Sequence, residues 1–238
     1  MSQPASPRKT AQPTRLRLAA VAPRTRVDQV VEAIIAGAAE GLFLPGDRLV
    51  EAEIARALDI SRVPVREALR ILESQGIVIN SPYKGMRLMT VDRERLHDVL
   101  SVRVALEKLA VQEALARPGG LALAPLAAMV EEMERMARIG DHYGIATCDT
   151  DMHRALCRMS GNAVLLSMWE TLSRQLTVIF GLSSLEKRLE TIVDEHRRLL
   201  EVLAGGDPAA IDREIETHIM DQLGEVDLAA IAERRRTG

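Results

Sequence analysis

The sequence contains few aromatic residues, two cysteines and no long apolar segment. Aromatic residues make up 2% of the 238 residues, so a core must be built from aliphatic side chains and the ten methionines, as in many helical bundles. Cys148 and Cys157 have no CxxC spacing, which argues against a disulfide framework and favours a reducing cytoplasm. No apolar run approaches the roughly 18 residues that span a bilayer, so no membrane segment is predicted.

The formal net charge of −3 hides a difference between the two halves of the chain. Residues 1–90 contain 13 Lys and Arg against 9 Asp and Glu, whereas residues 91–238 contain 18 against 25. A basic front half is consistent with a nucleic-acid partner. Residues 1–26 hold six of these basic residues, four prolines and no acid, which predicts a disordered tail or, alternatively, a basic arm that contacts DNA phosphates.

The periodicity of residues 27–90 predicts three helices followed by a hairpin. Apolar residues at helical spacing indicate a helix over 27–40 and a shorter one over 51–58, and Ser61 is a suitable N-cap for a third helix. The segments "IVIN" and "MRLMT" alternate like strands on either side of "SPYKG", which has turn chemistry. The sequence therefore predicts a winged helix-turn-helix domain over residues 27–90.

The third helix carries a stripe of positive charge. Arg62, Arg66 and Arg70 are four residues apart and share one face, opposite an apolar face. The stripe either belongs to an ordinary solvated helix or meets an anion. In a winged helix-turn-helix this helix enters the major groove and the hairpin reaches a neighbouring groove or the backbone. The predicted DNA contacts are Ser61, Arg62, Val63, Pro64, Arg66, Arg70, Lys84 and Gly85.

The rear half reads as helical throughout. Six helices are predicted, over residues 92–117, 122–139, 142–160, 163–182, 185–204 and 208–223. Short Gly- and Pro-containing connections imply antiparallel neighbours. The predicted fold class is therefore mainly α, with an all-α antiparallel bundle over residues 91–225 and a tail over 226–238. Trp169 and Met168 are expected in the core.

Two segments of this chain resemble known domains. The stretch "GLFLPGDRLVEAEIARALDISRVPVREALRILESQG" (41–76) resembles the DNA-binding module of the GntR family of bacterial transcription regulators. One departure is Ala52, where many relatives carry an arginine that contacts DNA. The rear half resembles the ligand-sensing FCD domain of the FadR subgroup. The segments that carry this resemblance are "VRVALE" (102–107), "DTDMHRAL" (149–156, with Met152 in place of a Phe), "SGNAVLL" (160–166), "DEHRRLLEVLAGGD" (194–207) and "ETHIMD" (216–221).

Four residues of the rear half form a candidate metal site. Asp149 and His153 are four residues apart on one predicted helix, and His196 and His218 lie on two others. By spacing alone, scattered histidines are usually surface or core residues. The resemblance places all four at the ligand positions of the family and so implies a divalent metal, Zn²⁺ or else Ni²⁺, Mn²⁺ or Fe²⁺.

The resemblance also implies an effector site beside the metal. Arg103 is expected to face the pocket and hold an effector carboxylate, because guanidinium matches carboxylate geometry; the alternative is an exposed helix arginine. Asn162 is assigned to the same effector-binding site.

Taken together, the residues and the resemblance predict a cytoplasmic transcription regulator and not an enzyme. It is expected to be a homodimeric repressor that binds a pseudo-palindromic operator in double-stranded DNA and responds to a small organic acid. Two rival functions are a metalloenzyme, in which the Asp and three His activate water, and a structural chromatin protein. A third alternative keeps the regulator but lets the metal only fasten the bundle.

Overall fold

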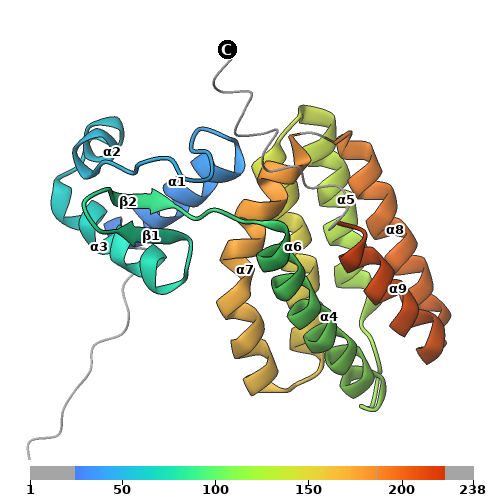
Figure 1. Cartoon of the computed structure of the whole chain (residues 1–238). Helices are drawn as coiled ribbons and strands as arrows, with labels where there is room; N and C mark the ends of the chain where they lie inside the picture. Colours follow the sequence, from blue (N-terminus) through green and yellow to red (C-terminus); the bar gives the residue numbers. More distant parts are fainter. Residues whose placement is uncertain (1–24, 186, 223–238) are drawn as a thin grey trace, which may run out of the picture.

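The computed structural model describes residues 25–185 and 187–222, and this part of the chain forms two packed domains (Figure 1). The first contains three helices and a two-stranded hairpin, and the second contains six helices. The mainly α fold with an N-terminal winged helix-turn-helix is therefore confirmed. Most of the predicted N-terminal tail, residues 1–24, and the predicted C-terminal tail, 226–238, lie outside the described residues.

Helix α1 (Arg26–Ala39) begins earlier than the predicted domain boundary. The Thr25 hydroxyl accepts a hydrogen bond from the Asp28 backbone N–H, and the Asp28 carboxylate accepts one from the Thr25 N–H, which is a capping box. Thr25 and Arg26 therefore belong to the folded domain and not to the tail.

The other elements of the winged helix-turn-helix follow the prediction closely. Helix α2 (Glu51–Ala57) and helix α3 (Arg62–Ser74) are joined by a tight connection, and strands β1 (Val78–Ser81) and β2 (Gly85–Leu88) pair antiparallel. The apolar face of α3 is buried. Ser61 occupies the N-cap position of α3, but its side chain makes no capping hydrogen bond, so the predicted capping role of its hydroxyl is wrong.

The six predicted helices of the bundle are all present. They are α4 (Arg93–Leu115), α5 (Leu123–Ile139), α6 (His142–Met159), α7 (Ala163–Ser184), α8 (Leu189–Gly205) and α9 (Pro208–Met220). Asp92, Asp141, Asn162 and Asp207 each accept a backbone hydrogen bond at a helix start, which explains where those helices begin. No helix in the described part of the chain is long and apolar enough to cross a membrane.

Helix α1 joins the two domains, because it packs against α3 on one side and α7 on the other (Figure 1). The contact between α1 and α7 is close at Gly181, where an added Cβ would lie 2.6 Å from the Ala39 Cα. Two hydrogen bonds reinforce the junction: Gln175 Nε2 donates to the Gln75 carbonyl at 2.6 Å, and Tyr143 Oη donates to Glu32 at 3.2 Å. The orientation of the DNA-binding domain is thus set by α6 and α7.

The Gly181–Ala39 contact makes a stability prediction. Replacing a helical glycine by alanine usually stabilises a protein by about 0.5–1 kcal/mol. Gly181→Ala should instead lower the free energy of unfolding by about 1–3 kcal/mol, because the new methyl group overpacks the contact. The matched control is Gly205→Ala, where an added Cβ meets nothing within 4 Å and the usual gain is expected. Urea denaturation measures both, and equal behaviour of the two variants would contradict the packing account.

Candidate metal centre and nucleic-acid interface

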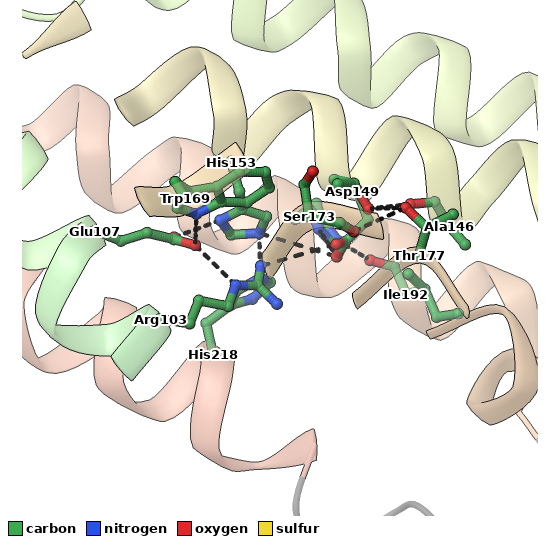
Figure 2. A network of polar contacts seen from close by, with 12 residues as sticks. Arg103, Glu107, Ala146, Asp149, His153, Trp169, Ser173, Thr177, Ile192 and His218 are labelled. Atoms are coloured by element: carbon green, nitrogen blue, oxygen red, sulfur yellow. Dashed lines mark hydrogen bonds and ion pairs between the residues drawn. The ribbon is translucent and has the colours of Figure 1, made fainter. Parts of the chain in front are cut away.

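Four side chains from three helices meet inside the bundle (Figure 2). Asp149 and His153 come from α6, His196 from α8 and His218 from α9, and all four are buried. One ligand atom from each of them lies within 4.8 Å of all the others. Asp149 and His153 therefore lie on one face of α6, as their spacing predicted. The packing of α8 and α9 brings His196 and His218 to the same point.

Hydrogen bonds fix two of the histidine rings with one nitrogen turned inward. His153 Nδ1 lies 2.6 Å from a Glu107 carboxylate oxygen, and His196 Nδ1 lies 2.7 Å from the Ile192 carbonyl. The Ile192 carbonyl oxygen can only accept a hydrogen bond, and so can the Glu107 carboxylate while it is ionised. Each Nδ1 therefore carries a proton, and each ring, when neutral, keeps a lone pair on Nε2. These lone pairs point at the cluster, where His196 Nε2 lies 3.0 Å from Asp149 Oδ1.

Two electron-rich atoms at that distance require a positive species between them. Either a second proton on His196 or a metal ion meets this requirement. The donor set of one carboxylate and three imidazoles is one that binds Zn²⁺ and related divalent ions. Metal-binding histidines also typically donate a hydrogen bond from the ring nitrogen that does not bind the metal to a carboxylate or a backbone carbonyl, as Nδ1 does here. The residues present therefore fit a divalent metal.

The charges around the cluster favour the protonation states that bind a metal. Burial lowers the pKa of His153, with a further contribution from Arg103, and burial with the neighbouring His196 and His153 holds the pKa of His218 well below its usual value. Burial opposes ionisation of Asp149, but Arg103 and the histidines outweigh it and hold the Asp149 pKa below its usual range. Neutral imidazoles beside an ionised carboxylate are the forms that bind a cation.

Arg103 is buried beside this cluster with most of its donors unused. Its Nε donates to Glu107 at 2.7 Å, and its guanidinium lies over the Phe180 ring, 4.9 Å from the ring centroid. Its two Nη groups and Asp149 Oδ2 are buried without hydrogen-bond partners, and Nη2 lies 3.8 Å from that oxygen. The alternative of an exposed helix arginine is therefore wrong. Unsatisfied buried polar groups of this kind are uncommon and need an occupant to explain them.

The spaces next to the cluster are small. One cavity of about 20 Å³ is lined by Asp149 and Phe180, and another of about 60 Å³ is lined by His218 and Glu214. Gln222 borders both. The first has room for about one water molecule and the second for a few. An organic acid would therefore need the helices to separate.

Glu107 is the residue of this site that the sequence analysis missed. It is fully buried, and its carboxylate accepts hydrogen bonds from Arg103, from His153 and from Trp169 Nε1, the last at 3.2 Å (Figure 2). Burial opposes its ionisation, but His153 and Arg103 lower its pKa to about 2. Its position four residues after Arg103 was the available signal, because that spacing places both side chains on one face of α4.

Asn162 lies at the N-cap of α7. Its Oδ1 accepts a hydrogen bond from the Leu165 N–H at the start of α7, and its Nδ2 donates to Glu113 at 3.2 Å. Neither of these bonds involves the metal cluster or Arg103. The structure thus gives Asn162 a helix-capping role, and its assignment to effector binding stays a prediction without structural support.

Most of the predicted DNA-contacting residues are exposed. Arg62, Val63, Arg66 and Arg70 are exposed on α3, and Ser61 is exposed just before it. Lys84 is exposed at the hairpin turn, next to Gly85 with φ of +75°. Pro64 is half-buried in the first turn of α3. The arginines of the stripe therefore lie outside the protein core. One of them, Arg66, forms an ion pair with Glu51.

Comparison with protein-family models assigns both domains. Residues 26–88 match the model for bacterial regulatory proteins of the gntR family, and residues 98–221 match the model for the FCD domain. The first match spans the winged helix-turn-helix, and the second spans most of the bundle, including Asp149, His153, His196 and His218.

Individual relatives agree with the family models. The chain is 29% identical, over 82% of its length and 86% of the relative's, to a probable D-xylose utilization operon transcriptional repressor of Paenarthrobacter nicotinovorans. It is 26% identical, over 79% of both chains, to the gluconate operon transcriptional repressor of Bacillus licheniformis. The fold is similar to that of a putative GntR regulator from Rhodococcus sp. RHA1, with a TM-score of 0.69, 22% identity and coverage of 87% of this chain and 98% of that one.

The buried position of Glu107 makes a second stability prediction. In metal-free protein, Glu107→Ala should lower the free energy of unfolding by about 3–5 kcal/mol, because the buried Arg103 loses its hydrogen-bonded carboxylate and keeps only the more distant Asp149, 3.8 Å away. The control is Glu216→Ala, which removes an exposed carboxylate paired with Lys108 and should cost about 1 kcal/mol or less. Chemical denaturation with a chelator present measures both. A cost for Glu107→Ala no larger than for the control would contradict the buried-pair account.

Proposed function

Because the chain belongs to the GntR family of bacterial transcription regulators and carries an FCD domain, we propose that it is a repressor whose operator binding is controlled by a small carboxylate at a metal centre. The family membership argues against both rival functions, the metalloenzyme and the structural chromatin protein, since the chain is a DNA-binding transcription regulator and not an enzyme. Two of its relatives are named as operon repressors, which supports the direction of control.

The observation that carries the proposal is the convergence of Asp149, His153, His196 and His218 within 4.8 Å, with two Nε2 lone pairs held inward. We assign these four residues as ligands of a divalent metal, Zn²⁺ or else Ni²⁺, Mn²⁺ or Fe²⁺. A six-coordinate ion such as Ni²⁺, Mn²⁺ or Fe²⁺ would offer positions beyond the four protein donors to an oxygen atom of a ligand, whereas Zn²⁺ would have to expand its usual four-coordinate shell to do so.

Arg103 supplies the second half of the proposed effector site. Its unpartnered Nη groups form the planar pair of donors that a carboxylate accepts, and they lie on the side of Asp149 whose Oδ2 is also unpartnered. A small organic acid would therefore satisfy donors that the protein leaves empty. Because the adjoining cavities measure only about 20 and 60 Å³, its binding favours a bundle in which α8 and α9 lie farther from α6.

Helix α6 is the route by which this change reaches the DNA-binding domain. One face of α6 carries Asp149 and His153, and another face, with Thr147 and Thr150, borders a polar cleft of about 500 Å³ against α1 and α7. Its Tyr143 also donates to Glu32 of α1. A ligand shifts an equilibrium between two states only by its differential affinity for them. The effector must therefore bind more tightly to the arrangement in which α1 no longer positions α3 to contact the operator. Coupling of about 1–3 kcal/mol is typical.

The proposed regulator acts as a homodimer on a two-fold symmetric operator. One recognition helix covers only a few base pairs, so two related by symmetry are needed for specific affinity. Helices α4 and α7 are neighbours, joined by the Trp169–Glu107 hydrogen bond, and both present large apolar side chains to solvent. Those side chains are Val102 and Leu109 on α4 and Val164 and Met168 on α7. Met168 is 57% exposed, so its predicted core position is wrong, and we assign it to the dimer surface.

The dimer is tested by sedimentation of the full chain. The wild-type protein should be a dimer when free and bind two chains per operator duplex. The double variant Leu109→Glu, Met168→Glu should be monomeric and lose operator affinity, because charges are costly in an apolar interface. Ile139→Glu, at an exposed apolar position on α5, should leave the dimer intact. A wild-type monomer both free and on DNA would exclude the dimeric mechanism.

The metal mechanism is tested with the double variant His196→Ala, His218→Ala and the control His97→Ala, whose exposed histidine lies outside the cluster. Metal content is measured after dialysis, and operator release is measured with a panel of small carboxylates that includes citrate and gluconate. The double variant should lose the metal and its response to the acid that releases the wild-type protein. If it loses the metal, remains folded and still responds normally, the metal only fastens the bundle and the mechanism is wrong.

A further inference from the structure

The arginine stripe on α3 is not uniform, because one of its members is bonded to the neighbouring helix. Arg66 Nε donates to both carboxylate oxygens of Glu51, at 3.1 and 3.2 Å, and Arg66 Nη2 donates to one of them at 2.9 Å. Glu51 is the first residue of α2, so this pair joins the two helices of the helix-turn-helix. Arg62 and Arg70, the other two members of the stripe, have no comparable bond among the described residues.

The pair is poorly placed to stabilise the fold. The side chains of Arg66 and Glu51 are 54% and 32% exposed, and ion pairs with such access to water contribute little to folding. Glu51 is also unfavourable for DNA affinity if α3 reads DNA as proposed: hydrogen bonding to Arg66 lowers its pKa, and the charges of Arg62 and Arg70 contribute, so the carboxylate beside the stripe is ionised. A carboxylate at a surface that meets phosphates needs another explanation.

The geometry of the pair provides one. Glu51 takes up the Nε edge of the guanidinium and one side of Nη2. Of the five guanidinium N–H groups, both on Nη1 and the second on Nη2 do not take part in these bonds. Those outer N–H groups form the two-pronged donor that arginine presents to O6 and N7 of guanine. The bond to Glu51 therefore restrains a flexible side chain and leaves its base-reading end uncovered.

We infer that Glu51 is a specificity-determining positioning residue, which holds the Arg66 guanidinium ready for a guanine in the major groove while its own charge weakens binding to DNA that lacks this guanine. The first effect lowers the entropy lost when Arg66 binds its base. The second adds repulsion against wrong sequences, where no base contact compensates for the carboxylate near phosphate. The inference rests on the proposed reading of DNA by α3.

Glu53 provides a matched control. It lies in the first turn of α2 like Glu51, so it interacts similarly with the helix dipole, but its exposed side chain is not bonded to Arg66. Glu51→Gln and Glu53→Gln remove the same charge from the same helix turn. Only the first weakens the restraint on Arg66, because the glutamine amide keeps one neutral acceptor where the carboxylate has two charged ones. Both variants should retain the wild-type melting temperature, because neither position is buried.

The experiment uses full-length protein and two DNA probes. The specific probe is a duplex recovered by the wild-type protein from a random-sequence library, and the nonspecific probe is a duplex of equal length and scrambled sequence. Fluorescence anisotropy gives the dissociation constant for each probe. The measured quantity is the dissociation constant for the nonspecific probe divided by that for the specific probe, so a smaller ratio means lower specificity. Arg66→Ala should reduce this ratio by roughly 10-fold to 100-fold. Glu51→Gln should reduce it by roughly 3-fold to 10-fold while tightening nonspecific binding. Glu53→Gln should leave the ratio at the wild-type value.

The double variant Glu51→Gln, Arg66→Ala completes a cycle that separates the causes. The inference predicts that Glu51→Gln has no further effect on the ratio once Arg66 is absent. Equal ratios for Glu51→Gln and Glu53→Gln would overturn it, as would an effect of Glu51→Gln that persists without Arg66. If Arg62→Ala and Arg66→Ala both leave operator affinity unchanged, the recognition-helix assignment itself fails, and that result is distinguishable because it does not involve Glu51.

Discussion

The bundle depends on a buried ion pair between Arg103 and Glu107 on α4. Both side chains are fully buried, and the Glu107 carboxylate also receives hydrogen bonds from His153 and Trp169. Taking two charges out of water is costly, and apolar residues of the same volume often stabilise a fold as well or better. The role of the pair is therefore better explained by its effect on the neighbouring His153 and Asp149 than by a contribution to stability. Glu107 sets the tautomer of His153, and Arg103 keeps Asp149 ionised, so both groups are in the forms that the proposed metal would need.

The position of α6 connects this centre to the DNA-binding domain. The helix carries two of the four proposed ligands on one face and borders the cleft against α1 on another. Thr150 of α6 contacts α7, since its hydroxyl lies 3.0 Å from that of Thr177 and also donates to the Ala146 carbonyl of its own helix. Helix α7 meets α1 at Gly181, where there is no room for a side chain. Close packing of this kind transmits displacements, because packed interiors deform little before they rearrange.

The sequence predicted the elements of this fold well because its signals are local. Helical periodicity, glycine and proline punctuation and capping residues located all nine helices of the described residues, and the i, i+4 spacing of Asp149 and His153 placed both on one side of α6. The convergence of His196 and His218 on that point was expected from the family resemblance and not from spacing. Properties set by tertiary contacts were harder. Glu107 resembles any helix acid until α4 is packed against α6. Met168 belongs to a strongly apolar helix, and only the packing of α7 shows that Met168 and Val164 are left exposed.

The two domains hold an arginine in the same way for different purposes. In each, a glutamate accepts from Nε of the arginine, and Nη groups remain for an external partner: Glu107 does this for Arg103, and Glu51 for Arg66. The buried pair is tied to the fold, because removing its glutamate leaves a buried charge without solvent and without its hydrogen-bonded partner. The exposed pair contributes little to the fold, since water solvates either member alone. On the proposed roles, changes at Glu51 would therefore tune DNA recognition with little effect on folding, whereas changes at Glu107 would affect folding and the proposed metal site together.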